Sequence, residues 1–139
     1  MLKIILASHG KFSEALYKSG SMIIGEQDYV RTVTFMPGEG LDDLLRKYEN
    51  VVNELGKDNE ILFLVDLFGG SPFNAASTIV IANDKYELVT GMNLPMYLEL
   101  VGNGEDISLE DAKQIATNSG KEGIINFEKN IEDDEEEEF

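Results

Sequence analysis

A chain of 139 residues, 42% hydrophobic and 27% charged, has the length and composition of one globular domain and holds no apolar run long enough to cross a membrane. Its net charge of −16 disfavours binding to nucleic acid or anionic lipid, which are themselves negatively charged. The absence of cysteine excludes disulfides, thiolate metal sites and cysteine nucleophiles. The N-terminal apolar stretch is too short for a signal peptide, so we expect a cytoplasmic protein.

Apolar, β-branched runs alternate along the chain with segments of helical periodicity, which is typical of a parallel sheet connected by crossover helices. Four strands are expected at the apolar runs over residues 3–7, 30–35, 61–65 and 86–90. Five helices are expected at the periodic segments over residues 13–24, 41–55, 72–82, 95–101 and 108–117. A short last strand is expected over residues 124–127. The pattern predicts an α/β domain with a four-stranded parallel sheet.

The acidic residues are concentrated at the C-terminus, where residues 132–138 supply seven negative charges and leave a net charge of only −9 on the rest of the chain. A block of like charges without apolar partners cannot offset the entropy that is lost on ordering. We therefore expect a folded domain over residues 1–129 and a disordered acidic tail over residues 130–139.

Polar residues follow the predicted strands at their carboxyl ends, which meet at one edge of a parallel sheet, where ligands bind. The first strand leads to His9, the only histidine in the chain. A lone histidine usually has no special function, but here Gly10 follows it and lets another molecule approach closely. His9 is therefore a candidate nucleophile or general base. One histidine and no cysteine exclude a multi-histidine zinc site, so no metal is expected.

Asp66 follows the third predicted strand and is expected at the same edge as His9. An aspartate after a strand is often only a turn former. If Asp66 accepts a hydrogen bond from one ring nitrogen of His9, however, it fixes the tautomer and leaves the other nitrogen free to react. Its charge then stabilises the ring once that nitrogen is modified. The pair is a stronger indication of catalysis than either residue alone.

A glycine-rich loop, Gly69-Gly70-Ser71-Pro72, follows Asp66 and leads into a helix. Ser71 suits the N-cap, and Pro72 suits the first helical position. Such a loop offers free backbone N–H groups, a hydroxyl and the positive end of a helix dipole, which together suit a phosphoryl group. Neither a Walker motif nor a Gly-x-Gly-x-x-Gly fingerprint is present, so the sequence does not indicate nucleotide binding.

Apolar side chains are also expected around this edge, and core packing explains at least half of them. Those that stay exposed would form a docking rim, for which methionine is suited because it adapts its shape to different partners. The apolar candidates are Phe68, Phe73, Met92, Met96 and Tyr97. The predicted docking residues are Phe68 and Met96, together with Pro37 and Asn93 in neighbouring loops.

Four segments of the chain resemble the IIA domain of the mannose-family sugar phosphotransferase system, and the resemblance covers about residues 1–128. The segments are Ser-His-Gly at 8–10, Met-Pro-Gly-Glu at 36–39, FLVDLFGGSPFNAA at 63–76 and GMNLPM at 91–96. The third segment is highly specific. With this resemblance we expect a flavodoxin-like fold, in which a four-stranded parallel sheet lies between two layers of helices.

The resemblance implies a phosphotransferase component of sugar uptake that carries a phosphoryl group and needs no cofactor. The family's phosphorylated histidine falls on His9, and the aspartate that binds its ring falls on Asp66. The Gly69–Ser71 loop would hold the phosphoryl oxygens, and we expect Gly10 to contribute to the same site. The expected donor is the phosphocarrier protein HPr. The expected acceptor is a IIB component, which in turn serves the membrane components IIC and IID.

The resemblance also implies a homodimer in which the last strand, residues 124–127, is exchanged between protomers. Many relatives continue into a linker and a fused IIB domain, whereas this sequence ends in the acidic segment. We therefore expect a free-standing IIA component whose IIB partner is a separate chain.

Three other interpretations remain open at this point. The phosphotransfer subunit of dihydroxyacetone kinase resembles the same family, although the loop over residues 68–74 is more similar to that of the sugar-transport branch. A two-component receiver domain would be phosphorylated on Asp66, but it needs an acidic pair where this chain has Ser8 and His9. A non-catalytic module would use the apolar rim alone to bind a partner.

Overall fold

The computed structural model describes residues 1–129, so the predicted acidic tail over residues 130–139 lies outside the described residues. The elements in chain order are β1 (Leu2–His9), α1 (Phe12–Ile24), β2 (Val30–Phe35), α2 (Leu41–Leu55), β3 (Glu60–Val65), α3 (Gly70–Ile81), β4 (Tyr86–Thr90), α4 (Leu94–Gly102) and α5 (Leu109–Glu122). All four strands are parallel, in the order β2-β1-β3-β4. This confirms the predicted α/β fold with a four-stranded parallel sheet.

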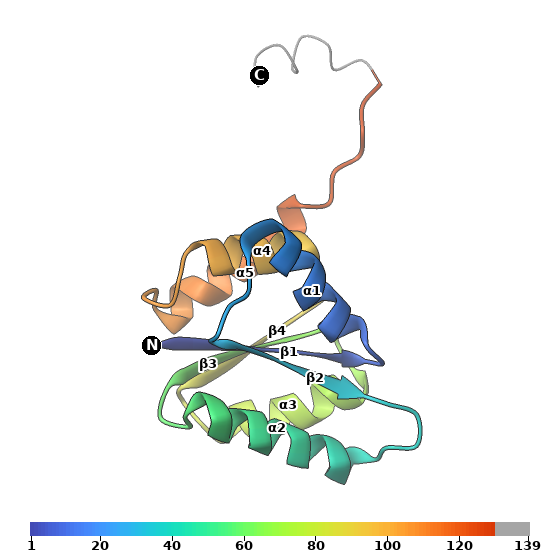
Figure 1. Cartoon of the computed structure of the whole chain (residues 1–139), viewed down its shortest axis with the longest axis vertical. Coiled ribbons are helices and arrows are strands. Elements are labelled where there is room, and N and C mark those ends of the chain that lie inside the picture. The colour runs from blue at the N-terminus through green and yellow to red at the C-terminus, as the bar shows by residue number, and fades with distance from the viewer. Residues whose placement is uncertain (130–139) are drawn as a thin grey trace.

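Helices cover both faces of the sheet, which gives three layers (Figure 1). α1, α4 and α5 lie over one face, and α2 and α3 lie over the other. The central strand β3 is fully buried from Ile61 to Val65, as expected for a strand that is covered on both sides. Each face therefore has its own hydrophobic core. Within residues 1–129, no helix is both long enough and apolar enough to cross a bilayer.

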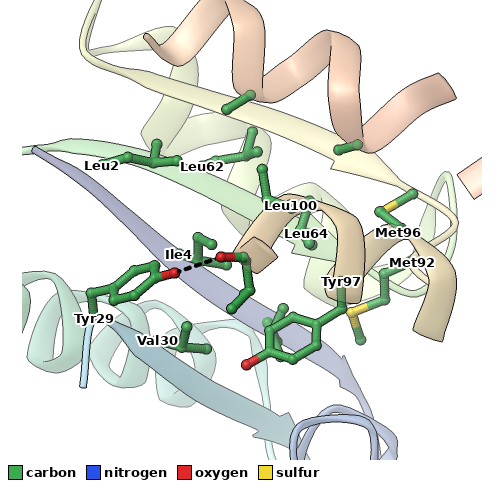
Figure 2. Packing of buried hydrophobic residues seen from close by; sticks show 14 of the residues in the cluster. Leu2, Ile4, Tyr29, Val30, Leu62, Leu64, Met92, Met96, Tyr97 and Leu100 are labelled. Atoms are coloured by element: carbon green, nitrogen blue, oxygen red, sulfur yellow. Dashed lines mark hydrogen bonds between the residues drawn. The ribbon is translucent and has the colours of Figure 1, made fainter. Parts of the chain in front are cut away.

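The core beneath α1, α4 and α5 combines aliphatic side chains with tyrosines (Figure 2). Ile4 of β1 and Leu100 of α4 are fully buried in it. The Tyr29 hydroxyl donates a hydrogen bond of 3.4 Å to the carbonyl oxygen of Val101. Tyr97 of α4 is also fully buried, but its hydroxyl has no hydrogen-bond partner among the described residues. This core is held together by shape and apolar contact more than by polar bonds.

Two glycines inside helices allow α4 to pack closely against its neighbours. A Cβ atom at Gly20 of α1 would lie 2.6 Å from Cε2 of Tyr97, and one at Gly120 of α5 would lie 2.8 Å from Cε of Met96. The sequence predicts the end of the last helix near residue 117, whereas α5 continues to Glu122. Glycine otherwise favours helix ends, but at position 120 it stands inside the helix, where a larger side chain would collide with Met96.

The start of α3 differs from the sequence prediction. The helix begins at Gly70 with Gly69 as its N-cap, so the assignment of Ser71 as the cap and of Pro72 as the first helical residue is wrong. The φ angles of Gly69 and Gly70 are 106° and 80°, values that residues with a Cβ atom rarely adopt. The glycine pair therefore turns the chain into the helix before Ser71 is reached.

The predicted last strand over residues 124–127 is absent from the single chain, where this segment has no regular secondary structure. Its apolar side chains Ile124, Ile125 and Phe127 are 79%, 81% and 74% exposed. A strand forms only where a neighbouring strand binds its backbone N–H and C=O groups, and residues 124–127 pair with none of the four strands.

Candidate active site

The candidate site lies at the carboxyl ends of the central strands. Ala7 of β1 is paired with Val65 of β3, so the residues that follow on the two strands leave the sheet side by side. These residues include His9, whose side chain is 46% exposed, and Asp66, whose side chain is 13% exposed. The structure therefore brings together the two residues that the sequence singled out from segments 57 positions apart.

Asp66 binds His9 through both the ring and the backbone. Its Oδ2 atom lies 2.8 Å from Nδ1 of His9 and accepts a hydrogen bond of 2.9 Å from the backbone N–H of the same residue. Its Oδ1 atom accepts a third hydrogen bond, of 3.0 Å, from the backbone N–H of Leu67. An ionised carboxylate can only accept, so the neutral imidazole carries its proton on Nδ1. The lone pair on Nε2 is then free to react.

Gly70 and Phe35 confine the imidazole from two further directions. A Cβ atom at Gly70 would lie 3.0 Å from Cε1 and 3.2 Å from Nε2 of His9, so only glycine fits there without displacing the ring. The ring of Phe35 meets the imidazole edge to face, with centroids 6.1 Å apart and planes at 82°. The sequence predicted the glycine loop, but it gave no signal for the contact with Phe35.

Hydrogen bonds to β2 fix the turn that follows His9. The backbone N–H of Gly10 donates a bond of 2.8 Å to the carbonyl oxygen of Phe35. The Ser8 hydroxyl accepts a bond of 2.7 Å from the backbone N–H of Ser13, whose own hydroxyl donates to the carbonyl oxygen of Val33 at 2.9 Å. Both serines are fully buried. These bonds could not be predicted, because a buried serine pair has no sequence pattern of its own.

The N-terminus of α3 lies against the reactive side of the imidazole, because its first residue is Gly70. The first backbone N–H groups of a helix have no partner within the helix, and they carry the positive end of its dipole. Gly70 borders Nε2, so the start of α3 lies at this nitrogen, and the start of a helix suits an anion. Among residues 1–129, no group of three or more His, Asp or Glu side chains is placed to hold a metal ion.

The predicted docking residues differ in their exposure. Phe68 is 82% exposed beside the site and packs on Phe73 with ring centroids 4.8 Å apart, and Pro37 is also exposed. Met96 is only 3% exposed, so its inclusion in a docking rim is wrong. Asn93 is the N-cap of α4: its Oδ1 accepts from the backbone N–H of Met96, and its Nδ2 donates to a carbonyl of α5. Its side chain therefore has a structural role.

Comparisons with known proteins all find components of one transport system. The family model described as "EIIA-man: PTS system fructose IIA component", where PTS is the phosphotransferase system, matches residues 3–117. The mannose-specific EIIAB component of Escherichia coli K12 is 40% identical over 124 residues, which are 88% of this chain and 38% of that protein. The fructose-specific EIIA component of Bacillus subtilis is 38% identical over 111 residues, which are 80% of this chain and 76% of that protein.

Solved structures with the same fold carry similar names. The phosphotransferase system component EIIA from Streptococcus agalactiae has a TM-score of 0.80 and 31% identity, and the match covers 91% of this chain and 98% of that chain. The mannose/sorbose-specific IIA subunit from Enterococcus faecalis has a TM-score of 0.82 and 28% identity, with 91% and 94% covered. The fold, the family match and these identities show that the chain belongs to the mannose, fructose and sorbose family of PTS EIIA components.

Proposed function

We propose that this EIIA component carries a phosphoryl group on Nε2 of His9, taking it from phosphorylated HPr and passing it to a IIB component during sugar uptake. The observation that carries the proposal is the bond of 2.8 Å between Nδ1 of His9 and Asp66, which leaves Nε2 as the free nitrogen beside the N-terminus of α3. Such a transfer needs a nucleophile, a carboxylate that orients it, and a group of N–H donors that bind the anion.

In the transfer step, the Nε2 lone pair of His9 attacks phosphorus in line with the leaving nitrogen of the donor phosphohistidine. A new N–P bond forms, the donor's N–P bond breaks, and its electron pair returns to the donor imidazole. The ring of His9 becomes cationic because Nδ1 keeps its proton. Asp66 stabilises that cation through the same hydrogen bond that fixed the neutral tautomer. The reverse sequence of events delivers the group to IIB.

The phosphoryl oxygens are held in this proposal by the Gly69–Ser71 loop and by the turn at Gly10. Backbone N–H groups at the start of α3 and the Ser71 hydroxyl neutralise charge on the equatorial oxygens, and Gly10 leaves room for them. A Cβ atom at Gly10 would have no atom within 4 Å, which leaves open space beside the phosphorylated ring. No metal ion or cofactor takes part.

Phe68 and Pro37 are the residues we assign to partner docking, together with Leu67, which precedes Phe68 and is 59% exposed. Exposed aromatic and aliphatic groups beside a reactive atom suit a protein donor, since burial of apolar area favours association. HPr and IIB both have to bring a phosphorylatable group to Nε2, so both dock here. Through IIB, the phosphoryl group reaches the membrane components IIC and IID.

A homodimer formed by exchange of residues 124–127 is part of the proposal. β4 is an edge strand of the sheet, and its residues Val89 and Thr90 line a groove of about 160 Å³ together with Ile124. An exposed apolar segment next to an open sheet edge can be buried by the matching segment of a second copy.

Intact-mass measurement tests the carrier function directly. The protein is incubated with phosphoenolpyruvate, enzyme I and HPr, and it is expected to gain the mass of one phosphoryl group only when all three are present. His9→Ala, which replaces a half-exposed side chain at the end of a strand, is expected to fold normally and to gain nothing. A mass gain in His9→Ala would refute the proposal, and an acid-stable, base-labile phosphoryl group in it would indicate Asp66 as the acceptor.

A further inference from the structure

Tyr48 links the body of the domain to the start of α3. It lies in α2, is fully buried, and packs edge to face on Phe63 of β3, with ring centroids 5.6 Å apart and planes at 75°. Its hydroxyl donates a hydrogen bond of 2.8 Å to the carbonyl oxygen of Pro72. A carbonyl oxygen has two lone pairs, so this bond can be added to the helical one and is an extra constraint on α3.

The turn that Tyr48 holds is also the turn that packs against the imidazole. Pro72 is two residues after Gly70, and a Cβ atom at Gly70 would lie 3.2 Å from Nε2 of His9. A bond to the carbonyl of Pro72 therefore fixes the part of α3 that borders the reactive nitrogen. The sequence alone gave no indication of this link, since Tyr48 fits the apolar stripe of its helix.

The Tyr48 hydroxyl keeps the proton that it donates to Pro72. Burial, and after it the nearby carboxylate of Asp66, raises the pKa of the Tyr48 hydroxyl above its ordinary value. The hydroxyl therefore keeps its proton throughout the physiological range and continues to donate to Pro72.

We propose that Tyr48 is a positioning residue for phosphoryl transfer: its hydroxyl holds the first turn of α3, and with it the Gly69–Ser71 loop, in place beside Nε2 of His9. The inference rests on the proposed function. In-line transfer depends steeply on the placement of the groups that bind the phosphoryl oxygens. Loss of the hydroxyl is therefore expected to slow the transfer step, while the docking surface at Phe68 stays intact.

Tyr48→Phe tests this inference, because it removes the hydroxyl and keeps the ring. Tyr97→Phe is the matched control: Tyr97 is equally buried, but it lies on the other face of the sheet and its hydroxyl has no partner among the described residues. Val52→Ala is a second control. It removes buried packing from α2 one turn after Tyr48 and leaves the bond to Pro72 unchanged.

Single-turnover transfer from phosphorylated HPr is measured over a range of donor concentrations, well below the unfolding temperature of every variant. Tyr48→Phe is expected to lower the maximal rate on the order of tenfold and to change the half-saturating concentration by less than about twofold. Tyr97→Phe and Val52→Ala are expected to keep the wild-type maximal rate. His9 is the only histidine, so its ring resonances report the tautomer, which should be unchanged in Tyr48→Phe.

Each other outcome contradicts the inference. A wild-type maximal rate in Tyr48→Phe shows that the hydroxyl does not position the loop. An equal loss in Val52→Ala or in Tyr97→Phe shows that general stability, and not the bond to Pro72, sets the rate. A changed tautomer of His9 shows that the substitution acts through the bond between Asp66 and His9 and not through the start of α3. If the wild-type protein accepts no phosphoryl group, the proposed function itself is refuted, which distinguishes the two failures.

Discussion

At the residue scale, the imidazole of His9 is held by three groups of different chemistry. Asp66 fixes Nδ1 by a hydrogen bond, Gly70 limits the ring on the side of Nε2, and Phe35 contacts it through an aromatic edge. Each group restricts a different movement of the ring. In the proposed transfer, the ring is thus oriented before a donor arrives, which removes an entropic cost from the step.

Asp66→Asn is expected to slow phosphoryl transfer by about ten- to a thousandfold, or about 1.4 to 4 kcal/mol. The substitution keeps the side-chain volume but removes the charge that stabilises a cationic, phosphorylated ring. The fold is expected to survive, as circular dichroism would show. Unchanged single-turnover kinetics would mean that Asp66 is only a turn residue.

Gly70→Ala is expected to reduce transfer by more than about tenfold, because the added methyl group displaces the ring of His9. Gly69→Ala is the matched control. Both positions have positive φ, 80° at Gly70 and 106° at Gly69, so each variant is expected to lose about 1 to 3 kcal/mol of stability. Only the Cβ atom at Gly70 would contact His9, whereas one at Gly69 would have no atom within 4 Å. Equal transfer rates in the two variants would show that backbone strain alone matters.

At the element scale, acidic side chains fix the loop between β2 and α2. The Glu39 carboxylate accepts bonds of 2.8 Å from Nζ of Lys47 and 2.7 Å from the backbone N–H of Met36. These bonds, that of Lys47 first, lower the pKa of Glu39 below its ordinary value. The carboxylate of Asp43 accepts from the backbone N–H of Gly40, which lowers its pKa in the same way. The loop that carries Pro37 is therefore held by ionised groups.

The stability of this loop should depend on pH in a definite direction. A carboxyl group whose pKa is lower in the folded state stabilises the fold above its unfolded pKa, and this contribution is lost as the pH falls through the folded pKa. Glu39→Gln is therefore expected to lower the unfolding temperature at pH 7, and the difference from wild type should vanish in acid well below pH 4.5, the ordinary pKa of glutamate. Glu49→Gln, an exposed position on α2, is the control. A difference that persists at low pH would contradict this assignment.

The sequence predicted the strands because apolar runs are local features, and it placed His9 and Asp66 at one edge because the carboxyl ends of parallel strands meet there. The hydrogen bond between them was implied only by the family resemblance. It failed at Ser71 because the cap of α3 depends on the φ angles of two glycines, which a pattern does not reveal. It failed at Met96 because periodicity shows that a helix has a buried face, but not which residues another helix will cover. The contact of Phe35 with His9 joins neighbouring strands, and only the register of β1 and β2 brings it about.

At the scale of the whole molecule, two features within residues 1–129 could meet in a dimer: the β4 edge of the sheet and the segment over residues 124–127. β4 ends the sheet on one side, and the segment after α5 exposes three large apolar side chains. Exposed apolar surface of this kind usually marks an interface.

Deletion of residues 124–139 is expected to convert the proposed dimer into a monomer or an aggregating protein, because it removes the segment to be exchanged and leaves α5 complete. Deletion of residues 132–139 alone is expected to change neither the dimer nor phosphorylation, since this segment has no apolar residue before Phe139. Light scattering on both proteins measures the outcome. A full-length monomer at micromolar concentration, or a dimer that persists without residues 124–127, would rule out the exchange.

The confinement of His9 by Asp66, Gly70 and Phe35 also has a kinetic consequence for a carrier that serves two partners. In the proposed function, donor and acceptor both have to reach Nε2 of the same imidazole, so we expect them to occupy the same space in turn. We therefore expect no ternary complex of carrier, HPr and IIB. Transfer is then expected to follow ping-pong kinetics, and an excess of unphosphorylated HPr is expected to compete with IIB and to slow the flow of phosphoryl groups toward the membrane.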